Sequence, residues 1–262
     1  EFEVIFSDGG STDRTLERID PDFRVVHSPR GRGIQMNTGA KEAQGDVLFF
    51  VHSDVLLKKD VLLQIPDKIK RGEAAGCLKI VFDSSHILMR ICGFMSNLRV
   101  KLRRIVFADQ GILIQKKLFE KMGGMPQMPL MEDYEFSLRM KKKKIPIIRI
   151  DSSILVSSRR FQKYGMLWTM WQMQKFQLRY RLGGDVEKIA KEYEISKEAI
   201  YAEVNKLTYK NVQNEKVLEK SKPTIVHRKR EIKEVSERIK KRENTIISIL
   251  LNGDLNIFQI IK

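Results

Sequence analysis

The sequence predicts an α/β fold, in which a mostly parallel sheet carries helices on both faces. Two observations support this prediction. Short apolar runs with β character alternate with helical stretches over residues 1–184, a pattern typical of βαβ units. The chain has 262 residues, 42% of them hydrophobic, which is enough for one large core with an appendage.

The expected elements follow one another in regular order. Each strand is a short apolar run, and the strands cover residues 2–7, 23–27, 46–51, 74–82, 105–115 and 145–157. Each helix is a longer capped or amphipathic stretch, and the helices cover residues 11–19, 34–43, 59–70, 86–104, 131–142 and 161–182. From residue 185 the pattern is helical, so we expect an α/β domain at 1–184 and an all-helical region at 185–262.

The amino-acid composition limits the kinds of partner that the chain is expected to bind. The net charge of +16 indicates anionic partners. Most of the excess lies in residues 1–184, which favours phosphate groups or an anionic membrane surface over a basic nucleic-acid tail. No stretch approaches the roughly 18 apolar residues of a membrane span, and no secretory signal is visible. Cys77 and Cys92 lack disulfide or metal spacing, so we expect a cytoplasmic protein, with the inner face of the membrane as a further location.

A carboxylate ends the most apolar of the expected strands. His52, Ser53 and Asp54 directly follow the run from Val47 to Val51. Open α/β sheets bind ligands at such strand ends, where an aspartate can hold a divalent metal and, through it, a diphosphate. The alternative is that Asp54 only caps the next helix.

Two glycine-rich turns follow the first two strands. Asp8 begins the first turn, at a position where a carboxylate can accept hydrogen bonds from a nucleotide base or ribose; the alternative is an ordinary strand-to-helix turn. Arg32 lies in the second turn, before Gln35 and Asn37. Arginines on a flexible loop at a helix N-terminus suit a diphosphate, and the alternative is a solvated basic loop.

Two further pairs carry charge. Glu132 and Asp133 open an expected helix, where acidic residues are favoured, and one of them can act as general base on an acceptor hydroxyl. Arg159 and Arg160 precede the aromatic helix and can neutralise a leaving diphosphate. The alternative for Arg159 and Arg160 is a plain basic surface pair.

Taken in order, these segments resemble family 2 glycosyltransferases of the GT-A fold. The matching segments are Asp-Gly-Gly-Ser-Thr-Asp at 8–13, Gln-Met-Asn-x-Gly-Ala at 35–40, Gly-Asp-Val-Leu-Phe-Phe-Val-His-Ser-Asp at 45–54, Gly-Gly-Met-Pro at 123–126, Met-Glu-Asp at 131–133 and Ser-Arg-Arg-Phe at 158–161. The sequence is most similar to a bacterial and archaeal subgroup with His-x-Asp in place of Asp-x-Asp, often labelled radical-SAM/selenodomain-associated transferases. The resemblance spans about residues 1–193.

The resemblance implies roles for individual residues. Asp8 matches the carboxylate that contacts the nucleotide base, and Asp54 matches the metal-binding second aspartate of Asp-x-Asp. His52 replaces the first aspartate. Asp133 matches the catalytic base, with Glu132 beside it.

The implied reaction is inverting transfer of a sugar from a nucleoside-diphosphate sugar, with a UDP-sugar as the expected donor, to a hydroxyl acceptor. Mn²⁺ or Mg²⁺ on Asp54, with Arg32 or Arg160, would stabilise the departing diphosphate, and Arg159 lies beside it. The family has a strand and a helix before the segment that starts here at Phe2. We therefore expect the sheet to lack its first strand and the nucleotide pocket to lack a wall.

Alternatives of other classes remain open. Residues 186–193 and 195–201 have the pattern of a helix-turn-helix, which suggests a DNA-binding regulator, although the modest charge there argues against nucleic acid. A nucleotidyltransferase is a further alternative, because such enzymes also carry carboxylates at their strand ends. The 161–182 helix carries Trp168 and Trp171 among basic residues, a pattern of a membrane-interface helix that presents a lipid acceptor, of core packing or of a homodimer face.

Overall fold

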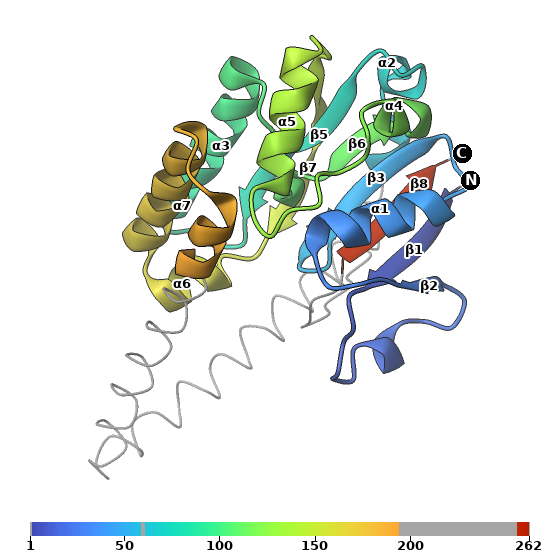
Figure 1. The fold of residues 1–262 in the computed structure, drawn as a ribbon, viewed down its shortest axis with the longest axis horizontal. Helices are drawn as coiled ribbons and strands as arrows, with labels where there is room; N and C mark the ends of the chain where they lie inside the picture. The colour runs from blue at the N-terminus through green and yellow to red at the C-terminus, as the bar shows by residue number, and fades with distance from the viewer. Residues whose placement is uncertain (1, 59–60, 194–255, 262) are drawn as a thin grey trace. The chain divides into compact units, whose positions relative to one another are not determined.

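The computed structural model describes residues 2–58, 61–193 and 256–261, and the backbone alone for the last of these ranges (Figure 1). The chain divides into two compact units. The first comprises Glu1–Val186 with Ile247–Lys262, and the second comprises Glu187–Ile246. All that follows concerns the first unit, except where stated.

One sheet of eight strands runs through the first unit, in the order β2-β1-β8-β3-β6-β5-β7-β4. The strands are β1 (Phe2–Asp8), β2 (Arg24–His27), β3 (Val47–His52), β4 (Val55–Leu57), β5 (Ala75–Phe82), β6 (Ile112–Gln115), β7 (Ile147–Val156) and β8 (Asn256–Ile261). The α/β class expected from the sequence is confirmed.

The sheet is mixed rather than mostly parallel. Only the pairs β1–β2 and β5–β7 are parallel among the described strands, whereas β3–β6, β5–β6 and β4–β7 are antiparallel. An apolar run indicates a buried strand but not its direction, because buried strands of either orientation have the same hydrophobic pattern. The direction depends on which distant strand becomes the neighbour.

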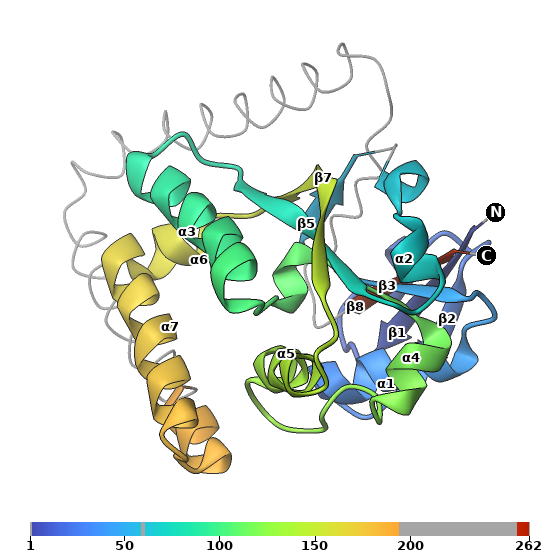
Figure 2. The ribbon, with the colours of Figure 1, turned by 90° about the horizontal axis from the view of Figure 1, so that it is seen from above.

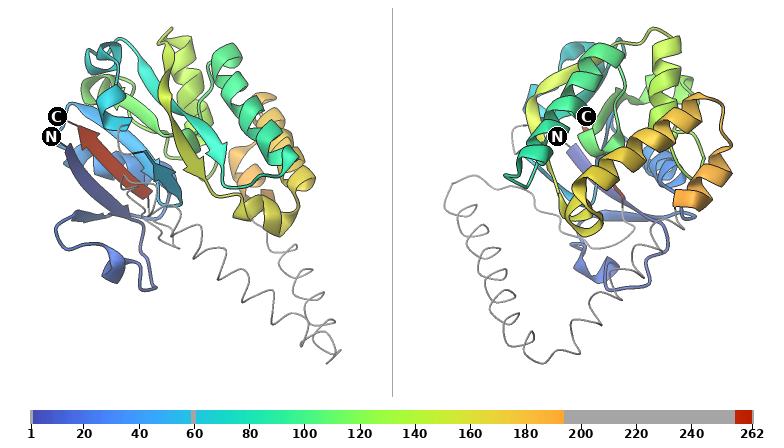
Figure 3. Two further views of the ribbon diagram at one scale, coloured as in Figure 1. Left: turned by 180° about the vertical axis from the view of Figure 1, so that it is seen from behind. Right: turned by 90° about the vertical axis from the view of Figure 1, so that its left-hand side faces the viewer.

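The position between β1 and β3 is occupied by β8, which is antiparallel to both (Figure 3, left). Asn256 pairs with Ser7 on one side and with His52 on the other. The C-terminal region, expected to be all-helical, therefore contributes a strand to the middle of the sheet. Buried strand edges need hydrogen-bond partners, and β8 provides them for β1 and β3.

The described helices cover both faces of the sheet. They are α1 (Arg32–Glu42), α2 (Asp67–Lys70), α3 (Ile87–Arg103), α4 (Lys116–Lys121), α5 (Glu132–Lys142), α6 (Arg159–Tyr164) and α7 (Met166–Arg181), with 3-10 turns η1 (Leu16–Arg18), η2 (Val61–Gln64) and η3 (Ala108–Gln110). Figure 2 shows α1, α4 and α5 on one face and α2 on the other. No described helix is both long enough and apolar enough to cross a bilayer.

Strand β3 lies between two hydrophobic cores. Leu48 and Phe50 point into the core under α1, α4 and α5, and Val47, Phe49 and Val51 point into the core under α2. This alternation is the period-two geometry of a strand buried on both faces. It explains why the sequence shows an unbroken apolar run here.

Several expected elements are shorter than predicted. Pro66 separates η2 from α2 within the expected 59–70 helix, because proline has no amide hydrogen to continue the first helix. Gly165, at φ 85°, separates α6 from α7 within the expected 161–182 helix. The expected 11–19 helix is reduced to the single turn η1, and the expected 105–115 strand to β6 preceded by η3.

Candidate functional site

The sheet register brings the last residues of β1 and β3 and the first residues of β6 and β8 to one edge. Ser7 and His52 both pair with Asn256, so β1 and β3 end at the same level. Phe50 pairs with Ile112, which places η3 and its Asp109 beside the end of β3. The resemblance to open α/β sheets predicts a ligand site at this edge.

An ion pair joins the first residue of α1 to the first residue of α5. The Arg32 Nε lies 2.8 Å from Glu132 Oε1, and an Arg32 terminal nitrogen donates to Glu132 Oε2 at 3.1 Å. The Glu132 side chain is 1% exposed and the Arg32 side chain 41% exposed, so only the arginine side chain reaches solvent. The Oε2 contact is a charge-assisted hydrogen bond, whereas Glu132 Oε1 has no hydrogen-bond partner among the described residues.

Burial raises the pKa of Glu132 to about 7. The charge of Asp133 contributes to this rise, whereas Arg32 opposes it. For Arg32, burial lowers the pKa, but Glu132, Asp133 and Asp109 outweigh it and leave the pKa above its ordinary value. The guanidinium is therefore permanently charged, and Glu132 can exchange a proton near neutral pH.

Backbone amides hold the Asp133 carboxylate in place. Its Oδ2 accepts a hydrogen bond from the Ala108 amide at 3.0 Å, and its Oδ1 accepts one from the Tyr134 amide at 2.7 Å. The side chain is 8% exposed. These bonds fix the carboxylate at the start of α5, where the positive end of the helix dipole favours an anion.

Asp109 is a site residue that the sequence reasoning missed. Its Oδ1 is buried and has no hydrogen-bond partner among the described residues. Burial raises the pKa of Asp109 to about 6, with Arg99 opposing and with Asp133 and Asp54 adding to the rise. The available signal was a carboxylate inside an otherwise apolar stretch, residues 105–115, which was interpreted as a strand.

His52, Asp54 and Arg160 belong to the same electrostatic environment. Burial lowers the pKa of His52, and Arg32 lowers it further against the opposing charges of Asp54 and Asp133. A histidine with a lowered pKa is neutral at pH 7. Burial and Arg32 likewise lower the pKa of Arg160, against Asp109 and Asp54. The structure thus brings together the predicted residues Arg32, His52, Asp54, Glu132, Asp133 and Arg160.

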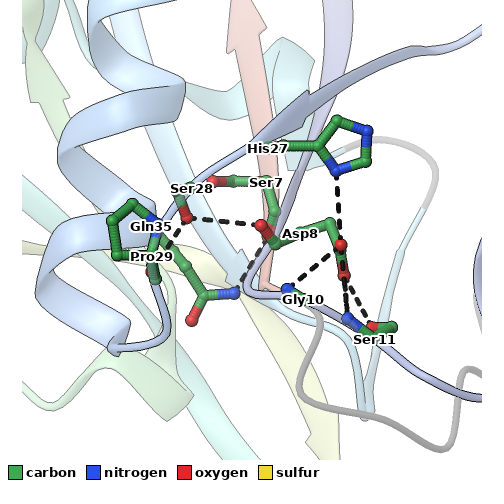
Figure 4. A network of polar contacts seen from close by, with 8 residues as sticks. All are labelled: Ser7, Asp8, Gly10, Ser11, His27, Ser28, Pro29 and Gln35. Carbon is green, nitrogen blue, oxygen red and sulfur yellow. Dashed lines mark hydrogen bonds and ion pairs between the residues drawn. The ribbon is translucent and has the colours of Figure 1, made fainter.

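Asp8 organises its own turn (Figure 4). Its carboxylate accepts hydrogen bonds from the Gly10 amide at 3.1 Å, the Ser11 amide at 3.1 Å and the Ser11 hydroxyl at 2.6 Å. Burial raises the pKa of Asp8, but the bonds from Ser11 and Gly10 outweigh it and leave the pKa below its ordinary value. Base recognition by Asp8 stays a prediction, since these contacts explain the aspartate as a turn-forming residue.

Gln35 and Asn37 use their amides on the backbone. Gln35 donates to the Ser7 carbonyl at 3.0 Å. Asn37 donates to the Met125 carbonyl at 2.8 Å and accepts from the Met125 amide at 2.7 Å. These bonds anchor β1 and the loop at residues 123–126. The ligand-binding role of Gln35 and Asn37 stays a prediction.

Arg159 lies on the exposed first turn of α6, and its backbone amide donates to the Ser157 hydroxyl at 3.3 Å. A role for its guanidinium stays a prediction.

The site offers few groups to a metal ion. Among the described residues no three His, Cys, Asp or Glu side chains form a metal-binding group. Asp54 is exposed and His52 is half-buried beside it. A magnesium or manganese ion at this edge would thus take most of its ligands from phosphate and water, which is a common arrangement for Mg²⁺.

Comparison with known proteins agrees with this arrangement. Residues 1–118 match the family model of "Glycosyl transferase family 2". This match covers less than half of the 262 residues and shows that residues 1–118 are similar to glycosyltransferase family 2. An uncharacterized glycosyltransferase, YfnE of Bacillus subtilis (strain 168), is 39% identical over 69 residues, which is 24% of this chain and 18% of that protein. The chain thus aligns with less than a fifth of that relative's length.

A low structural similarity was also found. The crystal structure of a mycobacterial protein has a TM-score of 0.40 at 16% identity, over 59% of this chain and 55% of that one. A score of this size does not establish a shared fold.

The C-terminal part matches a different family. Residues 152–250 match the family model "Putative helix-turn-helix protein, YlxM / p13 like". Residues 186–193, the expected first helix of that motif, are helical. The expected second helix, residues 195–201, lies outside the described part of the chain.

Proposed function

We propose that this chain is a family 2 glycosyltransferase, which transfers a sugar from a nucleoside-diphosphate sugar, with UDP as the expected nucleotide, to a hydroxyl acceptor with inversion. The observation that supports this most is the meeting of the Arg32–Glu132 ion pair with Asp54, Asp109, Asp133 and Arg160 at one edge of the sheet. A sugar transfer of this kind needs a carboxylate base and cations for a leaving diphosphate, and both lie there.

Asp133 would act as the general base on the acceptor hydroxyl. The Ala108 amide holds its Oδ2 at 3.0 Å, which sets the direction of the free lone pairs. Glu132, whose carboxylate is bound by Arg32, would hold that arginine toward the edge of the site. A positioned base contributes about 10² to 10⁴-fold to the rate.

Arg32 and Arg160 would neutralise the departing diphosphate. Burial and Arg32 lower the pKa of Arg160, and an anion between the two guanidinium groups would relieve this mutual repulsion. Asp54 and the neutral imidazole of His52 would hold Mn²⁺ or Mg²⁺, which supplies Lewis-acid stabilisation of the phosphate oxygens when bound.

The test is Asp133→Asn with a panel of UDP- and GDP-sugars. We expect the turnover number to fall at least about 100-fold, while donor affinity in isothermal titration calorimetry stays unchanged, because Asp133 faces the acceptor. Asp151→Asn, an exposed aspartate on β7, is the matched control. An equal loss of donor affinity in Asp133→Asn would refute the base assignment.

A second candidate is DNA binding through the C-terminal part, favoured by the helix-turn-helix family match at residues 152–250. An electrophoretic shift measured at 50 and 200 mM salt tests it, because phosphate contacts make DNA affinity fall steeply with salt. Absence of a shift at the lower salt would exclude this role.

A further inference from the structure

Helix α3 carries an apolar stripe on its outer side. Ile87, Ile91, Phe94, Met95 and Leu102 are all exposed, and Phe94 and Leu102 reach 65% and 71%. These residues recur three, four or seven positions apart, so they share one face of the helix. The opposite face, with Met89 and Val100, is buried in the protein. The helix thus has one apolar face inside the protein and another toward solvent.

Helix α7 repeats this arrangement. Trp168, Trp171 and Leu178 lie on its solvent side, and Leu182 directly follows its last residue; Trp171 is 58% and Leu182 77% exposed. Lys175 lies within this stripe, and its Nζ is 5.4 Å from the centroid of the Trp171 ring. Isolated exposed apolar residues are ordinary on protein surfaces, whereas two long stripes together mark an interaction surface.

The two helices lie next to each other, and we call their outer side the α3–α7 face. They are in contact, and the right panel of Figure 3 shows both on the side turned to the viewer. Two exposed stripes of aliphatic and aromatic residues thus lie on two adjacent helices of 17 and 16 residues.

The charge on these helices has one sign. Neither helix contains an aspartate or a glutamate. The basic residues are Arg90, Lys101 and Arg103 on α3 and Lys175, Arg179 and Arg181 on α7. Arg99 of α3 turns inward instead and donates to Gln110 Oε1 at 2.8 Å. The partner of this face must accordingly be apolar in part and anionic in part.

A groove continues the basic edge of the face. Its volume is about 930 Å³, and it lies between α3 and β5. Arg90 and Lys101 of α3 line it together with Lys79 and Arg149, and Phe94 forms part of its apolar wall. Basic groups beside an apolar hollow fit the headgroup and the first methylenes of an anionic lipid.

We propose that the α3–α7 face docks on the surface of an anionic lipid bilayer. Aromatic and aliphatic side chains enter the boundary between headgroups and acyl chains, while lysines and arginines beside them contact anionic headgroups. An anionic bilayer offers an apolar layer to both stripes and negative charge to the lysines and arginines beside them. A second copy of this chain fits less well, because a two-fold contact would place two basic faces against each other.

The experiment is vesicle flotation of the full chain without sugar donor, so its outcome is independent of the proposed transfer reaction. Vesicles of phosphatidylcholine alone are compared with vesicles containing phosphatidylglycerol. We expect recovery with the anionic vesicles only. The Phe94→Glu/Trp171→Glu variant should partition at least about tenfold more weakly, because two apolar contacts are lost and two anions are added.

The matched control is Leu63→Glu, an 87% exposed apolar residue on η2, which should bind like the wild type. A second variant, Arg90→Gln/Lys101→Gln, should lose about fivefold per basic side chain removed. Circular dichroism of each variant checks that folding is retained.

Equal recovery with neutral and anionic vesicles would overturn the proposal, as would equal partitioning of Phe94→Glu/Trp171→Glu and the Leu63→Glu control. Sedimentation velocity tests whether a second copy of this chain binds the face instead of a bilayer. A wild-type dimer that dissociates in Phe94→Glu/Trp171→Glu would assign the face to a second copy and would also overturn the proposal.

Discussion

The buried carboxylate of Glu132 makes a quantitative prediction about stability. Its pKa rises from an ordinary 4.5 to about 7 because burial penalises the charged form more than Arg32 stabilises it. Between these two values the native state binds more protons than the unfolded state. Stability therefore decreases as the pH rises from about 4.5 to 7. The contribution of Glu132 is fully favourable below 4.5 and is lost above 7.

Glu132→Gln keeps the shape of the neutral acid and removes its titration. We expect the free energy of unfolding of this variant and of the wild type to be similar at pH 4. At pH 8 the variant should be more stable by about 3 kcal/mol, which is the free energy linked to the pKa difference. The partial exposure of Arg32 limits the penalty of leaving that guanidinium without a charged partner.

The assay is urea unfolding followed by tryptophan fluorescence at pH values from 4 to 8. Glu120→Gln, an exposed glutamate on α4, is the control, and its stability should stay within about 0.5 kcal/mol of wild type throughout. If the difference between Glu132→Gln and wild type is the same at pH 4 and pH 8, Glu132 is not a buried acid with a raised pKa.

Two further predictions use residues around the site. Gly33→Ala should destabilise the protein by several kcal/mol, since an added Cβ would lie 2.2 Å from the Pro126 carbonyl oxygen. The control Gly93→Ala in α3 places its Cβ 3.6 Å from the nearest atom and should gain about 1 kcal/mol of helix propensity. Thermal unfolding compares the two variants, and equal melting temperatures would contradict the clash. Ser11→Ala removes a hydrogen bond that lowers the pKa of Asp8, so it should lower the free energy of unfolding by about 1 kcal/mol at neutral pH. This difference from wild type should shrink as the pH falls below the ordinary aspartate pKa of 3.8. A stability difference that is independent of pH in urea unfolding would contradict this account.

Local patterns were sufficient for much of the candidate site. The apolar run before His52 and Asp54 predicted a strand that ends on polar groups, and β3 has this form. Glu132 and Asp133 were expected to open a helix, and α5 begins at Glu132. Such predictions succeed because a strand end or a helix start depends on neighbours within a few residues.

Asp109 shows where local patterns fail. The stretch around it is apolar, so a strand was the natural interpretation, yet residues 108–110 form a 3-10 turn that precedes β6. Its raised pKa depends on Asp133, Asp54 and Arg99. The hydrogen-bond partners of Gln35 and Asn37 likewise lie far along the chain, with Met125 88 positions after Asn37.

The sequence by itself determined the α/β class, the family 2 motifs and the residues at the strand ends, because hydrophobic periodicity and short motifs are properties of adjacent residues. Only the tertiary structure decided that β8 lies between β1 and β3, that Arg32 pairs with Glu132 across 100 positions, and that α3 and α7 share an apolar basic face. These features depend on long-range packing, in which buried hydrogen-bonding groups and charges take whichever partners the folded chain brings within reach.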